Sequence, residues 1–253
     1  MNLIDNIVAQ AAAMTAIRRD IHAHPETCFE EHRTSELVAT LLTEWGIEVH
    51  RGLGKTGVVG LIRGRDGGQS GRSLGLRADM DALPMQELNS FAHASKTPGK
   101  MHACGHDGHT TMLLAAAQHL ARQRDFDGTV VLIFQPAEEL GGGAHAMIED
   151  GLFERFPVDA VFGTHNWPGM AVGDIALSSG PVMASTNEFK IVIQGRGCHG
   201  AMPHMGIDPV PVACQVVQGF QTIISRNKKP IDSAVLSVTM IPVSYTHLRA
   251  HET

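Results

Sequence analysis

The chain has few aromatic residues: Phe, Trp and Tyr make up 5% of its 253 residues, and Tyr occurs once. It also has no excess of positive charge, because 20 Lys and Arg residues stand against 26 Asp and Glu residues, for a net charge of −6. Proteins that bind nucleic acids combine a basic surface with aromatic side chains that stack on bases. Both scarcities argue against a nucleic-acid partner.

Paired cysteines and long apolar runs are also absent. The four cysteines, Cys28, Cys104, Cys198 and Cys214, form no Cys-x-x-Cys pair, and a chain of this length does not need disulfides to fold. The sequence has no run of about 18 apolar residues and no apolar N-terminal segment typical of a secretion signal. We therefore expect a reduced, cytoplasmic, soluble protein with no membrane partner.

Histidine, by contrast, is abundant. It occurs 15 times, often beside Cys, Asp or Glu, and these are the side chains that bind transition metals. Hydrophobic residues make up 43% of the chain, which is ordinary for a protein that buries a core. The composition therefore favours a globular protein with a metal site.

Short apolar runs alternate with amphipathic segments in the first part of the chain. Helices are expected at residues 4–21 and 34–45 and directly after residue 109, where apolar side chains recur at helical spacing. Strands are expected where apolar runs are short, at 58–63 and 73–77, and buried strands at 129–135 and 158–164. This alternation predicts an α/β fold.

The pattern changes near residue 183. Strands are expected at 188–194 and 234–240, with a helix at 209–224 between them. The sequence therefore predicts a second, smaller α/β unit. The expected divisions are a first domain at 1–183, a partial second domain at 184–241 and a segment that does not fit the rest at 242–253.

Residues 101–109 read MHACGHDGH and place several metal-binding side chains just before an amphipathic helix. Cys104 and His106 are two positions apart, so a loop or extended segment can direct both at one ion, and a metal deprotonates a thiol that binds it. The alternative is a small buried cysteine beside a helix-capping Asp107. His102 and His109 flank the pair and are candidates for orienting the ligands.

Carboxylates and a further imidazole follow three of the expected strands. In an α/β sheet, sites form beyond the carboxyl ends of the strands, so these side chains are expected to meet at one edge. The side chains and the strands before them are Asp79 and Asp81 after 73–77, Glu138 and Glu139 after 129–135, and His165 after 158–164.

Each of these positions has a plainer alternative. The Glu138–Glu139 pair could be a solvated acidic turn before a run of glycines, His165 a core histidine, and the two aspartates an acidic loop. The functional interpretation makes one glutamate a metal ligand and its neighbour a general base. His165 is then a third ligand, and the aspartates orient the ligating imidazoles.

His199 lies in a glycine-rich segment, GRGCHGAMPH, at residues 195–204. Such a loop lets an imidazole approach a ligand closely and donate a hydrogen bond to a developing oxyanion. The alternative is a polar turn that carries surface imidazoles. The neighbouring Cys198 raises a further alternative, a cysteine nucleophile, which the metal-binding side chains elsewhere make unnecessary.

Together the motifs resemble those of the M20 metallopeptidase family. The likeness covers about residues 1–241. The branch that the chain resembles contains amidohydrolases of hippurate, N-acyl amino acids and plant auxin conjugates. The matching segments are RDIHAHPE at 19–26, LRADMDALP at 76–84, MHACGHDGH at 101–109, PAEE at 136–139 and AMPH at 201–204.

The resemblance implies a mixed-sheet catalytic domain that holds two divalent metal ions, with an inserted lid or dimerisation domain. Thiolate, imidazole and carboxylate ligands allow Zn, Mn, Co or Ni, and the resemblance favours Mn or Zn. The implied activity is hydrolysis of the amide bond in N-acyl or N-aroyl amino acids, by a homodimer. The implied metal ligands are Cys104, His106, Glu139 and His165.

The resemblance also implies three catalytic roles. Glu138 would take a proton from the attacking water and pass it to the leaving amine. Asp81 would support the geometry of the ligands. His199 would polarise the substrate carbonyl, reaching the site of the partner subunit.

The chain departs from the family pattern at several points. Cys198 and Leu140 stand where glycines are usual. The family continues well beyond residue 241 and supplies a last metal-binding histidine, which neither His247 nor His251 has the context to replace. We interpret 242–253 as a product of read-through or sequence assembly. A second interpretation of the chain is therefore a metal-binding fragment without catalytic activity.

Overall fold

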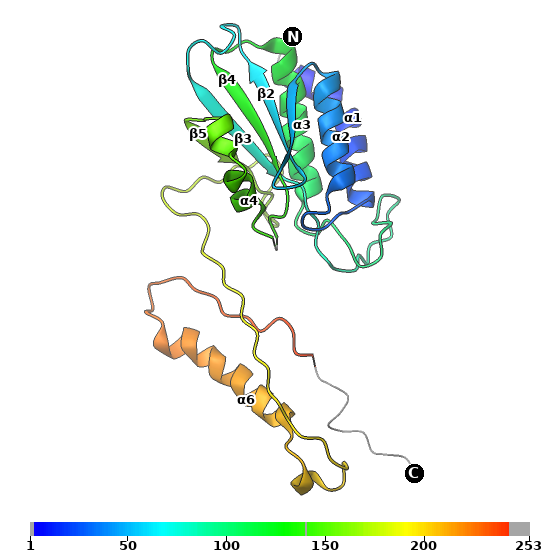
Figure 1. Ribbon diagram of the computed structural model, residues 1–253, viewed down its shortest axis with the longest axis vertical. Helices are drawn as coiled ribbons and strands as arrows, with labels where there is room; N and C mark the ends of the chain where they lie inside the picture. The colour runs from blue at the N-terminus through cyan, green and yellow to red at the C-terminus, as the bar shows by residue number, and fades with distance from the viewer. Residues whose placement is uncertain (1–2, 140, 243–253) are drawn as a thin grey trace. The chain divides into compact units, whose positions relative to one another are not determined.

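The computed structural model describes residues 3–139 and 141–242 (Figure 1). The chain forms two compact units, Met1–Asp174 and Ile175–Thr253. The second unit thus begins before residue 184, where the sequence analysis places the start of the second domain. Leu140 lies outside the described residues, as does the terminal segment from residue 243 onward, including His247 and His251.

The first unit is built on one mixed sheet of five strands in the order β1-β2-β4-β3-β5 (Figure 1). β3 runs parallel to both of its neighbours, β4 and β5, whereas β2 is antiparallel to β1 and β4. The predicted α/β class and mixed sheet are therefore confirmed. The strands are β1 Glu48–Leu53, β2 Gly57–Arg63, β3 Ser73–Asp79, β4 Thr129–Gln135 and β5 Ala160–Gly163.

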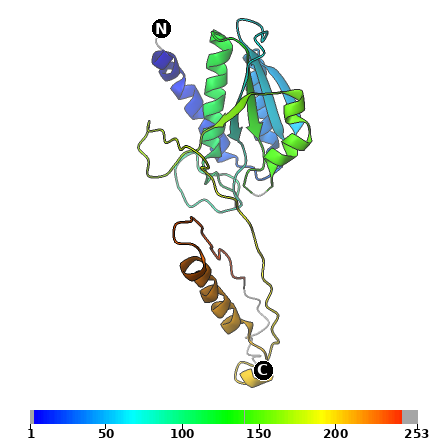
Figure 2. The same cartoon turned by 90° about the vertical axis from the view of Figure 1, so that its left-hand side faces the viewer.

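Helices cover both faces of this sheet (Figures 1 and 2). β4 is buried on both sides: Val130, Leu132 and Phe134 join the core beneath α2 and α3. Val131 and Ile133 join the core beneath α4 and α5 on the other face. Because successive side chains point to opposite faces, a strand covered on both faces needs apolar residues throughout. The helices are α1 Leu3–Ala23, α2 His32–Glu44, α3 His106–Gln123, α4 Gly143–Glu149 and α5 Leu152–Arg155.

The strand register brings the functional segments to one edge of the sheet. Asp79, the last residue of β3, pairs in parallel with Gln135, the last residue of β4. The chain therefore leaves both strands at the same edge. A bridge between Leu83 and Met101 then places the start of the 101–109 segment beside the chain that follows β3.

β5 differs from its prediction in length and in burial. A buried strand is predicted at 158–164, but β5 covers only Ala160–Gly163 and all of its residues are exposed. Its place in the sheet gives the reason, because β5 is an edge strand that pairs with β3 alone. The apolar side chains of Val161 and Phe162 accordingly remain 45% and 59% exposed.

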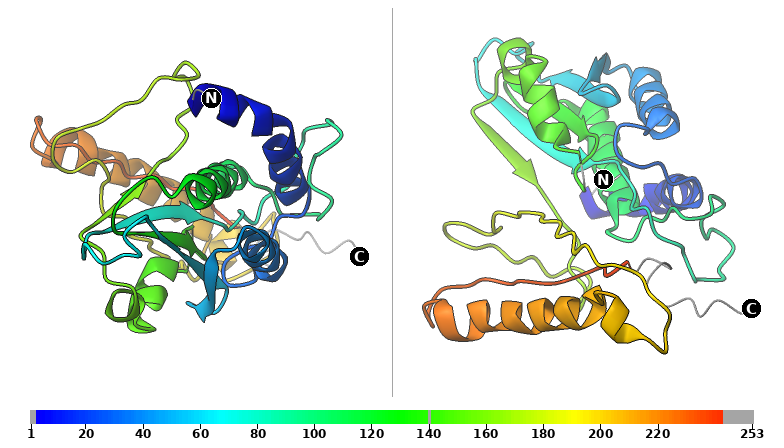
Figure 3. Two further views of the ribbon diagram at one scale, coloured as in Figure 1. Left: turned by 90° about the horizontal axis from the view of Figure 1, so that it is seen from above. Right: turned by 60° about the horizontal axis from the view of Figure 1, so that its bottom comes forward.

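The second unit contains the helix α6, Pro209–Thr222, which continues into a π-helical turn, η2, Ile223–Asn227 (Figure 3). Asp208 begins α6, because its carboxylate accepts a hydrogen bond of 2.9 Å from the backbone N–H of Val210. Pro209 follows at a position where a helix leaves the N–H unpaired in any case. The predicted helix at 209–224 is confirmed.

The two strands predicted for the second unit are wrong. Residues 188–194 and 234–240 have neither helical nor strand structure. A strand requires a neighbour whose backbone groups pair with its own. In the described part of this unit, the only strand-type pairing is an isolated bridge between Arg196 and Ile207. Alternating side chains therefore do not suffice here. No described helix in either unit has the length and apolarity to cross a membrane.

We expect Leu132→Ala to lower the free energy of unfolding of the chain by about 2–5 kcal/mol, because it leaves a cavity at a fully buried position of β4. Leu88, which is 92% exposed, provides a matched control, and Leu88→Ala should change little. Denaturant unfolding followed by circular dichroism measures both. Equal losses in the two variants would contradict the central place of β4 in the core.

Candidate metal centre

His106 lies at the centre of the candidate site. It is the first residue of α3 and follows Gly105, whose φ of 92° lets the chain turn into the helix. The His106 side chain is fully buried, and its Nδ1 lies 2.8 Å from the backbone oxygen of Asp81. A proton on Nδ1 donates to that oxygen, which leaves the Nε2 lone pair free to bind a metal.

Asp81 holds two of the site's components together. Its Oδ1 lies 3.2 Å from Nδ1 of His106, and its Oδ2 accepts a hydrogen bond of 2.9 Å from the backbone N–H of Glu139. Although burial raises it, these hydrogen bonds keep the pKa of Asp81 below its ordinary value. An ionised Asp81 therefore ties the start of α3 to the turn after β4.

Two buried atoms of the site have no hydrogen-bond partner among the described residues, Nε2 of His106 and Oε1 of Glu139. They face one another at 3.8 Å. Buried polar atoms rarely remain without partners, because leaving one unpaired costs free energy. A cation bound between an imidazole nitrogen and a carboxylate oxygen would satisfy both, so these residues fit a metal ion.

Cys104 and His165 complete a second group of ligand atoms around His106. Sγ of Cys104 lies 3.3 Å from Nε2 of His165. The ligand atoms of Cys104, His106 and His165 lie within 4.8 Å of one another, and so do those of His106, Glu138 and Glu139. A third such group joins Asp79 and His109 to His106. His106 belongs to all three groups, and each offers ligand types that Zn and related metals accept.

The pKa of Cys104 bears on the cysteine-nucleophile alternative. Burial and the nearby carboxylate of Glu139 raise the pKa of this thiol to about 12. A nucleophilic cysteine needs the opposite, a pKa lowered by positive charge. Cys104 therefore lacks the surroundings of a nucleophile, whereas a metal would stabilise its thiolate.

The two glutamates differ in exposure. The side chain of Glu139 is 17% exposed, whereas that of Glu138 is 41% exposed, with Oε2 4.0 Å from Nε2 of His106. Burial raises the pKa of Glu139. The carboxylate of Glu139 is therefore directed into the site. The carboxylate of Glu138 lies at the open side of the site, where a water molecule can reach it.

His109 and Asp79 form a supporting pair behind these side chains. Nδ1 of His109 lies 2.7 Å from Oδ1 of Asp79. The backbone N–H of Asn166 donates to Nε2 of His109 at 3.1 Å. Burial raises the pKa of Asp79, but His109 and Arg77 lower it to about 2. Asn166 is absent from the sequence-based candidates, although its place beside His165 could have suggested it.

Asp107 and His22 have roles that the sequence analysis does not predict. Asp107 does not cap α3. Its Oδ2 instead lies 3.0 Å from Nδ1 of the buried His22, and Nε2 of His22 lies 3.2 Å from Glu87. The buried His102 lies close to His22, and burial lowers the pKa of His102 to about 4. Among the described residues, neither His22 nor His102 belongs to a group of metal-ligand atoms.

His199 belongs to the second unit. It is exposed, and its Nδ1 accepts a hydrogen bond of 3.1 Å from the backbone N–H of Ala201. Its role in polarising a substrate stays a prediction.

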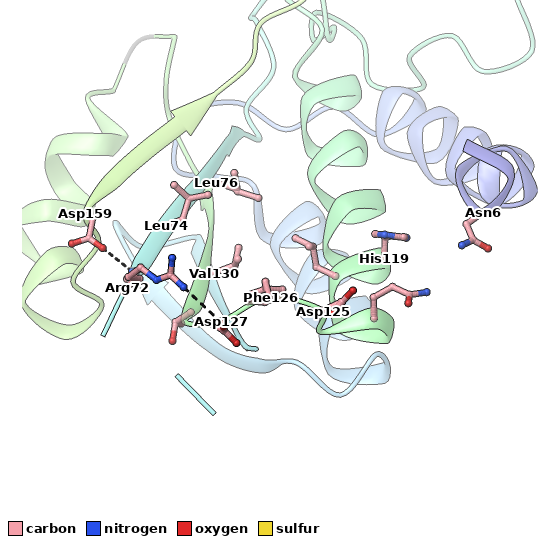
Figure 4. A pocket seen from close by; sticks show the side chains of 14 residues that line it. Asn6, Arg72, Leu74, Leu76, His119, Asp125, Phe126, Asp127, Val130 and Asp159 are labelled. Atoms are coloured by element: carbon pink, nitrogen blue, oxygen red, sulfur yellow. Dashed lines mark hydrogen bonds and ion pairs between the residues drawn. The ribbon is translucent and has the colours of Figure 1, made fainter. Parts of the chain in front are cut away.

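Figure 4 shows a surface hollow of about 870 Å³ in the first unit, and none of the candidate metal ligands lines it. It is lined by Leu74, Leu120 and Val130 among others, and it includes Ser73 and Thr129, the first residues of β3 and β4. The candidate ligands follow the opposite ends of these strands. The hollow therefore has no part in the chemistry of the metal centre.

The sequence matches the model of Peptidase family M20/M25/M40 over residues 75–247. It is 49% identical over 238 residues to the hippurate hydrolase of Campylobacter jejuni, a match that covers 94% of this chain and 61% of the relative. It is 44% identical over 248 residues to the N-acyl-L-amino acid amidohydrolase of Geobacillus stearothermophilus, with 97% and 65% covered. The chain thus spans less than two thirds of the length of these curated relatives.

A solved structure gives a similar result. The Bacillus subtilis YXEP protein is described as a dinuclear metal-binding peptidase of the M20 family. It is 38% identical to this chain with a TM-score of 0.67, and the match covers 85% of this chain and 56% of that one.

We expect Gly105→Ala to weaken Zn²⁺ binding by about 10–100-fold, as is usual when the support of a ligand is disturbed. A Cβ at Gly105 would lie 2.3 Å from Oδ1 of Asn166 and displace the segment that carries His165. Gly99 is the control, because its φ is also positive but a Cβ there meets nothing within 4 Å. Competition with a chromophoric chelator measures affinity. Equal affinities for Gly105→Ala and Gly99→Ala would contradict this expectation.

Proposed function

This chain belongs to peptidase family M20/M25/M40, and we propose that the whole protein is a metal-dependent amidohydrolase of N-acyl or N-aroyl amino acids. It would release a carboxylic acid and an amino acid. The observation that carries the proposal is the set of three groups of ligand atoms that share His106. The names of the two relatives, a hippurate hydrolase and an N-acyl-L-amino acid amidohydrolase, support the substrate class.

Two divalent ions are proposed at this centre, by analogy with the dinuclear metal-binding structure of the same family. Mn and Zn are the proposed metals. When bound, such ions act as Lewis acids on the amide carbonyl and lower the pKa of water. The proposed ligands are Cys104, His106, Glu139 and His165.

Glu138 is the proposed general base. Its carboxylate stands at the open side of the site, with Oε2 4.0 Å from Nε2 of His106. It would accept a proton from the attacking water and deliver it to the nitrogen of the leaving amino acid. Asp81 would hold His106 and Glu139 in place throughout, since it bonds to both.

His199 is proposed to donate a hydrogen bond to the carbonyl oxygen of the substrate as negative charge develops there. We also propose that the whole protein is a homodimer in the cytoplasm. The role of His199 and these two proposals rest on the sequence and the family resemblance.

A second candidate function is metal binding without hydrolysis. The chain covers 61% of the hippurate hydrolase and 65% of the N-acyl-L-amino acid amidohydrolase. The family resemblance implies a further metal-binding histidine beyond residue 241. The 253-residue chain is therefore tested separately from the whole protein.

We expect Glu138→Ala in the whole protein to keep its metal content and to lose about 10²–10⁴-fold in kcat with hippurate, because the proton acceptor is gone. Glu149→Ala is the control, since Glu149 is an exposed glutamate that pairs with His145 on α4. Turnover assays and elemental analysis on the same samples measure both quantities. Unchanged turnover in Glu138→Ala would remove Glu138 from the mechanism.

Metal removal tests the centre as a whole. We expect a chelator to abolish hydrolysis by the whole protein, and Mn²⁺ or Zn²⁺ to restore it. Activity that resists chelation but is lost on thiol alkylation would favour a cysteine hydrolase instead. Elemental analysis of the 253-residue chain separates the two candidate functions, because two ions per chain favour a working site and one or none favours the fragment.

A further inference from the structure

Glu31 is a completely buried carboxylate that the proposed reaction does not use. Its Oε1 accepts hydrogen bonds from the backbone N–H groups of Phe29, at 3.0 Å, and Ala137, at 2.9 Å. Its Oε2 accepts a hydrogen bond of 2.5 Å from the hydroxyl of Thr56. One side chain thus joins three segments of the chain. The segment that contains Ala137 is the turn that carries Glu138 and Glu139.

Glu31 does not serve the helix that it precedes. It occupies the N-cap position of α2, but its side chain makes no capping hydrogen bond. Glu26 performs that task by accepting from the backbone N–H groups of Arg33 and Thr34 at 2.9 and 2.8 Å. The carboxylate of Glu31 is therefore directed wholly to the three converging segments.

The backbone is strained where these segments meet. Among the described residues, four non-glycine residues have positive φ, and three of them are Phe29, Lys55 and Ala137. Phe29 and Ala137 donate to Glu31 themselves, and Lys55 precedes Thr56. Such conformations cost free energy and persist only where their surroundings hold them. The hydrogen bonds to Glu31 supply that hold.

The turn after β4 is thus fastened at two points by buried carboxylates. Oε1 of Glu31 binds the N–H of Ala137, and Oδ2 of Asp81 binds the N–H of Glu139 at 2.9 Å. Glu138 lies between these points. Asp81 also has a backbone hydrogen bond with Glu138, so the two carboxylates hold the backbone of the turn from Ala137 to Glu139. From this fixed backbone the side chains of Glu138 and Glu139 reach His106 with different exposure, 41% and 17%.

We propose that Glu31 is a positioning residue that holds the turn at residues 136–139 so that Glu138 and Glu139 take different roles at the metal centre. This inference rests on the proposed function. Burial raises the pKa of Glu31 even though Thr56 and Ala137 donate hydrogen bonds to it. An apolar side chain would avoid that cost of burial but would leave the N–H groups of Phe29 and Ala137 without this acceptor.

Two variants of Glu31 in the metal-loaded whole protein separate reach from charge. Glu31→Gln keeps the length of the side chain, and its amide oxygen can accept from both backbone N–H groups. Glu31→Asp keeps the charge but is one methylene shorter. Glu30→Asp is the matched control, because it makes the same change at the neighbouring exposed glutamate, which bonds to Lys100 and Thr27.

We expect Glu31→Asp to lower kcat per metal-loaded site by about 10–100-fold, with KM and metal content unchanged, because a misplaced base loses rate without loss of binding. Glu31→Gln and Glu30→Asp should stay within about threefold of the unmodified protein. Wild-type kcat per loaded site in Glu31→Asp would overturn the proposal. An equal loss in Glu31→Gln would also overturn it, since a side chain of the same reach would then fail to hold the turn.

Hydrogen exchange supplies a readout that needs no activity. In the unmodified protein, the amide of Ala137 should be protected from exchange. In Glu31→Asp this protection should fall much more than that of the Glu139 amide, which Asp81 binds. Unprotected exchange at the amide of Ala137 in the unmodified protein would overturn the proposal even if the variants fail to fold. Absence of hydrolysis by the unmodified protein would defeat the proposed function alone, because slow exchange at Ala137 would still show that Glu31 holds the turn.

Discussion

The carboxylate of Asp81 is the contact on which the candidate site depends. It bonds to the ring of His106 with one oxygen and to the backbone of Glu139 with the other. Asp81 follows β3, Glu139 follows β4 and His106 begins α3. A single buried carboxylate therefore aligns three segments. The parallel pairing of β3 with β4 makes this contact possible, since both strands end at the same edge of the sheet.

Negative charge accumulates around this contact. Asp79, Asp81 and Glu31 are buried, and Glu138 and Glu139 lie close by. Buried carboxylates are costly unless hydrogen bonds or cations compensate them. Backbone N–H groups and imidazoles do so for the first three, whereas Oε1 of Glu139 has no hydrogen-bond partner among the described residues. The electrostatics of the centre thus favour a bound cation, and the surrounding carboxylates serve to orient its ligands.

Much of the fold follows from local patterns. β2, β4, α2 and α3 are apolar at the spacing of their secondary structure, and each forms near its predicted position. The strands predicted for the second unit do not form. Alternating apolar and polar side chains suit one covered face of a sheet, but they do not supply the neighbouring strand with which a strand must pair. β5 is exposed for a related reason: its sequence reads as buried, but its place at the sheet edge decides its environment.

The sequence by itself determined the chemical types and order of the candidate ligands, because a thiol, an imidazole or a carboxylate keeps its chemistry wherever it lies. The convergence of these groups after the strands also follows from the sequence, since the strand ends of an α/β sheet set it. Only the tertiary structure decided which buried groups support them. The bonds from Glu31 to Ala137 and from His22 to Asp107 join positions 106 and 85 residues apart. No local pattern records such pairs, because packing of distant segments creates them.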